Sequence, residues 1–208
     1  MKNDQLVYEP QIKLWGLSLI IAPLIFGIST FFWQNGEYGV NGGTMLAVAT
    51  IFWILAFMGL FDLLKEKSPR YATWGLLIAI AGCISGANFG FVGVYSEVFN
   101  ISHQNYIQQL SKYPVSANIL LFWSGPLFPL SLLVLGIMLG KTRSVPLWVA
   151  ISISVAAILF PLSRIPRIEW IAHLADGLLM VPLAFTGWKY LFKNNSGKIS
   201  VDIITSQV

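Results

Sequence analysis

The sequence predicts an all-α integral membrane bundle of six transmembrane helices, with the N- and C-termini both cytoplasmic. Only 11% of the 208 residues are charged and 56% are hydrophobic, whereas a soluble domain carries about 25% charged residues. Six apolar stretches approach the roughly 20 residues that are needed to cross a hydrocarbon core of about 30 Å. Basic residues collect on one side of these stretches, which gives the bundle its predicted orientation.

The apolar stretches lack a two-residue alternation, so they predict helices and not the strands of a barrel. The fifth is short and has Pro161 at its end, so we expect it to borrow flanking residues or to thin the bilayer locally. The six predicted spans are Leu14–Trp33, Thr44–Leu64, Tyr71–Tyr95, Val115–Leu139, Leu147–Leu162 and Trp170–Leu191.

The connections are mostly short, so residues 1–193 are expected to form a single transmembrane domain, with 194–208 as a polar cytoplasmic tail. The longest outer loop, Ser96–Pro114, carries Tyr106, Ile107 and Leu110 among polar residues. This pattern predicts a short helix lying on the outer membrane surface.

Ten of the 13 Lys and Arg residues fall on the side that holds both termini, and Lys112, Arg164 and Arg167 fall on the other. Because Lys and Arg concentrate in cytoplasmic loops, the termini are expected inside, in a plasma (inner) membrane. The formal net charge of +4 is spread over several loops, so we expect no nucleic-acid partner. Cys83 is the one cysteine, which excludes an intrachain disulfide and a cysteine-based zinc site.

Small residues form a stripe along the predicted third span. They recur at spacings of three and four, which places them on one helix face where another helix can approach closely. Asn88 lies roughly opposite this stripe, and Ser85 lies to one side of it. The stripe contains Gly82, Gly86, Gly90 and Gly93, preceded by Gly75 and Ala79.

Glu169, His173 and Asp176 lie at positions i, i+4 and i+7 of the sixth span and so share a helix face. An ionisable group near the middle of a membrane helix costs about 2.5–3.5 kcal/mol, so it faces the bundle or water. One interpretation is a structural network in which Asp176 pairs with His173 and with Asn88 or Ser85. Another is a polar cavity that opens outward and takes a proton, an ion or a small ligand.

A metal site is a third interpretation of the same face, since carboxylates and imidazole are acceptable ligands for zinc or manganese. Three ligands on one helix cannot easily converge, and no second cluster of His or Cys completes the sphere. We therefore predict no metal and no cofactor. Arg164 and Arg167 lie just outside this face. They are expected either to pair with Glu169 and bind lipid phosphates, or to line an anion-binding mouth.

The string Cys83-Ile84-Ser85-Gly86-Ala87-Asn88-Phe89-Gly90 resembles the serine helix of rhomboid intramembrane proteases, and Ala172-His173 resembles their Ala-His pair. The resemblance would imply a Ser–His dyad. The resemblance covers about a dozen residues and departs from the family pattern in three ways. Cys83 stands where the family has a glycine, and two helices separate Ser85 from His173 where the family has one. The predicted third span also runs outward, whereas the family's serine helix runs inward. We therefore assign no family from it.

These observations favour a small transporter-like or ligand-binding membrane protein rather than an enzyme. Its polar cavity is expected in the outer half of the bundle, between the third, fourth and sixth spans. The expected partners are the lipid bilayer, a small polar or anionic ligand, an ion or a proton, and further copies of the chain. One alternative is an intramembrane enzyme with His173 and Asp176 as acid and base; the other is a non-catalytic subunit that assembles through the glycine stripe. The expected cavity residues are Ser85, Asn88, Ser124, His173 and Asp176.

Overall fold

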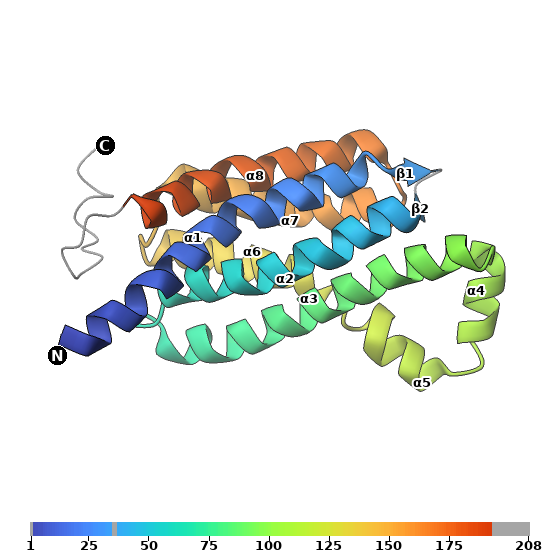
Figure 1. Cartoon of the computed structure of the whole chain (residues 1–208), viewed down its shortest axis with the longest axis horizontal. Helices are drawn as coiled ribbons and strands as arrows, with labels where there is room; N and C mark the ends of the chain where they lie inside the picture. The colour runs from blue at the N-terminus through green and yellow to red at the C-terminus, as the bar shows by residue number, and fades with distance from the viewer. Residues whose placement is uncertain (1, 35–36, 193–208) are drawn as a thin grey trace.

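The computed structural model describes residues 2–34 and 37–192, which form a bundle of long helices (Figure 1). Six helical segments within these residues are long and apolar enough to cross a membrane. This confirms the prediction of an all-helical, multi-pass membrane protein. The predicted tail 194–208 lies outside the described residues. The long helices are α1 (Lys2–Thr30), α2 (Val40–Asp62), α3 (Pro69–Val98), α6 (Leu127–Lys141), α7 (Leu147–Arg164) and α8 (Glu169–Leu191).

Several span boundaries differ from the sequence prediction, and two of them involve identifiable local features. The first span ends at Thr30, and Trp33 belongs to a two-stranded hairpin of β1 (Trp33–Gln34) and β2 (Glu37–Tyr38). The indole of Trp33 packs edge-on against the Tyr38 ring across this hairpin. The fifth helix continues through Pro161 to Arg164, because a proline in the last turns of a helix removes only one late hydrogen bond.

The six long helices close a ring in chain order. Their main contacts join α1 to α2 and α8, α3 to α2 and α6, and α7 to α6 and α8. Aromatic side chains fill the centre of the ring: the Phe26 ring lies 6.2 Å from Trp53, 6.0 Å from Phe128 and 5.7 Å from Phe160 between centroids. Trp53 is fully buried. Where these aromatic side chains lie, the centre of the bundle is therefore a packed core.

The start of α1 and the end of α8 lie at the same end of the bundle (Figure 1). Gly16 of α1 packs against Tyr190 of α8, while Gly27, further along α1, faces Asp176 near the start of α8. Helices α1 and α8 are therefore antiparallel neighbours. Which side of the membrane this end occupies remains a prediction from the basic residues.

The glycine stripe of α3 packs against other helices of the same chain. A Cβ atom added at Gly90 would lie 2.6 Å from the carbonyl oxygen of Gly43 in α2, and one at Gly82 would lie 2.5 Å from the backbone nitrogen of Phe128 in α6. The stripe continues at Gly93, which faces the Tyr38 carbonyl, whereas Gly86 is looser and meets only the Thr50 methyl group. These contacts account for the stripe without a second copy of the chain.

The fourth span is broken where the sequence predicted one helix over Val115–Leu139. It consists of α5 (Pro114–Ala117), a π-helical turn η1 (Asn118–Phe122) and α6, which begins at Leu127. Pro126 and Pro129 explain the break, since each lacks an N–H and its ring clashes with the carbonyl four residues earlier. By contrast, α1 continues unbroken through Pro23.

The segment between α3 and α5 contains α4 (His103–Leu110), which confirms the predicted short helix. Ser102 caps this helix by accepting a hydrogen bond from the Asn105 amide. Its position on the membrane surface remains a prediction.

The close contact between α2 and α3 can be tested with alanine substitutions. Gly90→Ala places a methyl group against the Gly43 backbone, so we expect it to lower the free energy of unfolding by about 1–3 kcal/mol. The matched control is Gly177→Ala, where the added Cβ meets nothing within 4 Å. Denaturant titration in detergent measures both, and equal stability of the two variants would contradict the close-contact account.

Candidate functional site

A buried ion pair joins three helices at the end of the bundle that carries the hairpin. Arg164, in the last turn of α7, places Nη2 2.8 Å from Oδ1 and 3.1 Å from Oδ2 of Asp176 in α8. The Thr30 hydroxyl at the end of α1 donates to Asp176 Oδ2 at 2.7 Å. The same Arg164 nitrogen lies 3.2 Å from the Thr30 oxygen. The Asp176 carboxylate therefore links the ends of α1 and α7 to α8.

The ion pair lies in an aromatic environment. The guanidinium carbon of Arg164 lies 4.7 Å from the Phe160 ring centroid, 5.2 Å from that of Trp33 and 5.3 Å from that of Phe26. The Asp176 side chain is 5% exposed and that of Arg164 is 13% exposed. Cation–π attraction in such a desolvated setting is worth about 2 kcal/mol. The rings therefore compensate part of the cost of removing the guanidinium from water.

The guanidinium retains unused hydrogen-bonding capacity. Nη1 of Arg164 donates to the Ser163 hydroxyl at 3.2 Å, while its Nε is buried and has no hydrogen-bond partner among the described residues. Arginine grips a carboxylate or phosphate best through two parallel N–H groups. Asp176 is instead held by a single nitrogen, which leaves the Nε–H group of the guanidinium without a described partner.

Local chain geometry brings Arg164 and Asp176 together. α7 ends at Arg164, and α8 begins at Glu169 after a short turn in which Arg167 has a φ of 59°. Asp176 then lies two turns into α8, beside the end of the preceding helix. The sequence analysis placed Arg164 just outside the acidic face, either as a partner of Glu169 and lipid phosphates or at an anion-binding mouth. The structure instead places it inside, with Asp176.

His173 and Glu169 lie further from the core. His173 Nε2 is 3.6 Å from Glu169 Oε1, and their side chains are 29% and 63% exposed. The His173 ring packs against Phe31, with 4.3 Å between centroids. The hydrogen-bond partners of Asp176 in the described chain are Thr30 and Arg164. The expected hydrogen bond between His173 and Asp176 is therefore absent there.

Arg167 also has a different partner from the one expected. Its Nη1 lies 2.6 Å from Oε1 of Glu37 in β2. This ion pair links the turn between α7 and α8 to the hairpin, and Trp33 of the same hairpin covers the Arg164 guanidinium. The hairpin therefore forms part of the wall around the buried pair.

The remaining predicted residues form a separate group at the broken fourth span. Asn88 Nδ2 donates to the Leu120 carbonyl at 3.1 Å, and Ser85 Oγ donates to the Leu121 carbonyl at 3.4 Å. Ser124 Oγ is buried without a partner among the described residues. Since α3 and α8 occupy opposite sides of the ring, the expected pairing of Asp176 with Asn88 or Ser85 does not form. The Ser85–His173 dyad implied by the rhomboid resemblance does not form either.

A cavity of about 300 Å³ lies beside this second group, between α3 and the returning segment of α4, α5 and η1. Burial raises the pKa of Tyr106 above its ordinary value, which strengthens the preference of its phenol for the neutral form. The lining contains no residue of α8, so this cavity and the ion pair are distinct. Prominent among the lining residues are Asn88, Phe91, Tyr95, Tyr106, Tyr113 and Leu120.

The sequence did not indicate Thr30, Phe26, Trp33 or Phe160 as site residues. Thr30 is separated from Asp176 by 146 positions, and an apolar aromatic in a membrane helix is ordinary. Among residues 2–34 and 37–192, no group of three His, Cys, Asp or Glu side chains is arranged to hold a metal ion. In comparisons with protein-family models, curated protein sequences and solved structures, nothing matches this chain.

Proposed function

We propose that this chain is a small transporter-like or ligand-binding membrane protein that binds an anion at Arg164, with Asp176 as the resident counter-ion. The observation that carries the proposal is the buried Arg164–Asp176 pair, held through one guanidinium nitrogen while Nε has no described partner. A guanidinium in a low-dielectric, aromatic-lined setting is a strong and selective group for carboxylate or phosphate.

A purely structural role explains the pair less well. Replacing a buried ion pair with packed apolar residues is often neutral or stabilising. Ionisable residues inside membrane helices are expensive, and they commonly mark ligand, ion or proton pathways. The cost of burying Arg164 and Asp176 is therefore best explained by what the two charges bind.

Anion binding at Arg164 would replace the Asp176 carboxylate with the bound anion as the partner of the guanidinium. The Arg164 guanidinium would then donate its hydrogen bonds to the incoming anion, and Asp176 would lose its cationic partner. An unpaired carboxylate in apolar surroundings is costly, so a proton would neutralise Asp176 while the anion is bound. The partly exposed His173 and Glu169 side chains lie on the same face of α8, between Asp176 and the start of that helix, where they can pass a proton.

We infer from the basic residues that both termini are cytoplasmic and that the ion pair lies toward the outer side of a plasma (inner) membrane. Lys141 lies in the last turn of α6, Lys189 in the last turn of α8, and Lys65 and Lys67 in the turn between α2 and α3. These element ends lie at the end of the bundle where the described chain begins and ends (Figure 1). Arg164 lies at the other end of the bundle, where the positive-inside tendency predicts few basic residues. Its role in the buried ion pair with Asp176 explains this exception.

The anion site predicts a thermal shift in detergent-solubilised protein. Ligands that bind only the folded state raise the melting temperature by mass action. With acetate, phosphate and sulfate as probes and chloride at equal ionic strength as reference, at least one should raise the melting temperature. Arg164→Gln should lose the shift, while Asp176→Asn should enlarge it because the guanidinium has lost its competitor.

Lys112→Gln is the matched control, since Lys112 is an exposed cation of the outer loop that bonds Gln109. It should respond to the anions as the wild type does. The proposal is wrong if none of the three anions stabilises the wild type, or if Arg164→Gln keeps the full response.

The orientation can be tested by labelling single cysteines in intact cells. Gln108 is exposed on α4, and Ser196 belongs to the predicted tail. An impermeant maleimide added outside should modify Gln108→Cys and spare Ser196→Cys until the membrane is permeabilised. The buried Cys83 should stay unlabelled in the parent. Labelling of Ser196→Cys alone would reverse the orientation.

A further inference from the structure

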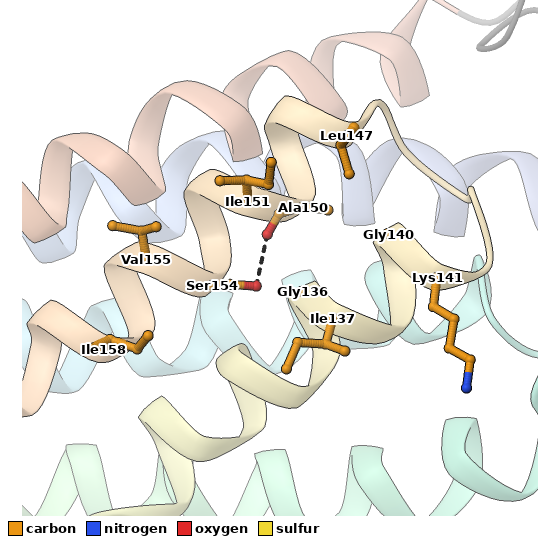
Figure 2. Close-up of a pocket in the computed structure, with 10 residues that line it drawn as sticks. All are labelled: Gly136, Ile137, Gly140, Lys141, Leu147, Ala150, Ile151, Ser154, Val155 and Ile158. Atoms are coloured by element: carbon orange, nitrogen blue, oxygen red, sulfur yellow. Dashed lines mark hydrogen bonds between the residues drawn. The ribbon is translucent and has the colours of Figure 1, made fainter.

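A groove runs between α6 and α7 at the bundle end opposite the ion pair, with a volume of about 280 Å³ (Figure 2). Its floor consists of small residues. A Cβ atom at Gly136 would meet the Ser154 hydroxyl and lie 3.0 Å from the Ala150 carbonyl oxygen, and one at Gly140 would lie 3.1 Å from the Ala150 Cβ. These contacts show that the glycines let α6 and α7 approach closely, and the two closely packed backbones form the floor of the groove.

The surface of the groove is apolar along its length. The Ser154 hydroxyl donates to the Ala150 carbonyl at 2.9 Å, so its hydrogen bond is satisfied within α7. Large aliphatic side chains form the walls and are about half exposed, which in a membrane-spanning bundle means exposure to lipid. These wall residues are Ile137, Leu147, Ile151, Val155 and Ile158.

Cations gather at one end of the groove. Lys141, in the last turn of α6, lines it directly (Figure 2). Arg143 is exposed two residues later, and Lys67 Nζ reaches the carbonyl of Thr142 between them at 2.6 Å. The lining includes no acidic residue, so this end is complementary to a negative charge at the membrane interface.

We propose that the groove binds one acyl chain of an anionic phospholipid, with the lipid phosphate beside Lys141 and Arg143. The apolar walls match a hydrocarbon chain, and the cations lie where a chain seated in the groove emerges toward its headgroup. A second copy of this protein fits less well. Two copies inserted in the same direction and related by a two-fold axis would place their Lys141 side chains at equal depth. The two ammonium groups would repel each other, because the groove has no acidic residue to neutralise them.

Native mass spectrometry of the full-length protein in detergent tests the proposal. The probes are phosphatidylglycerol and phosphatidylcholine with identical acyl chains. The wild type should bind phosphatidylglycerol more tightly. Lys141→Gln should weaken that affinity about fivefold, the equivalent of about 1 kcal/mol for one cation near an anionic surface, and should weaken phosphatidylcholine binding less, because the choline cation offsets the charge of its phosphate.

Gly140→Leu fills the groove and should abolish binding of both lipids. Its matched control is Gly177→Leu on α8, where an added Cβ meets nothing within 4 Å. Lys189→Gln is the charge control, since Lys189 lies in the last turn of α8 over the Phe185 ring and outside the groove. Both controls should bind as the wild type does. Lys141→Gln changes an exposed side chain, so it tests the headgroup contact even if Gly140→Leu fails to fold.

Three results would overturn the proposal. Equal loss in Lys141→Gln and Lys189→Gln would indicate general surface charge. Full displacement of phosphatidylglycerol by glycerol phosphate would indicate a headgroup site without a chain site. A wild-type dimer that Gly140→Leu converts to monomer, with lipid binding unchanged, would make a second copy the occupant.

Discussion

Polar groups within a hydrocarbon layer have no water to bind, so a polar group that lacks a partner inside the protein is costly. This constraint explains the two polar clusters of the bundle. At the broken fourth span, Asn88 and Ser85 supply donors to the carbonyls of Leu120 and Leu121. At the opposite side of the ring, the buried Asp176 carboxylate forms an ion pair with Arg164 and accepts a hydrogen bond from Thr30. Its burial requires both partners. The cluster around Asp176 carries full charges, so it determines how the ends of α1, α7 and α8 must meet.

The sequence predicted the features that depend on composition and helical period. Long apolar stretches become helices in lipid, and the spacing of four, four and three residues from Gly82 through Gly86 and Gly90 to Gly93 correctly indicated close packing on one face of α3. The break in the fourth span comes at Pro126, whereas Pro23 lies in an unbroken helix, so a proline in the sequence does not by itself locate a break. A proline interrupts a helix only where neighbours can take up the freed carbonyls.

Sequence reasoning found Asp176 but assigned it the wrong neighbours. Residues on one helix face suggest a cluster with each other, so His173 was the expected partner. Helix packing instead brings the end of α7 against α8, and the stronger cation Arg164 takes the carboxylate. The ring order of the helices decides this outcome, because it places Asn88 and Ser85 away from α8. That order depends on long-range packing and has no local signature.

The central claim is that Arg164 and Asp176 act as one charge-paired unit, and a double-mutant cycle tests it most directly. Arg164→Met and Asp176→Leu each leave one buried charge unpaired, so each should cost about 3–5 kcal/mol in the free energy of unfolding in detergent. The double variant removes both charges, so it should be more stable than either single variant. Additive losses in the double variant would contradict the account, because they would mean that the two side chains stabilise the bundle independently.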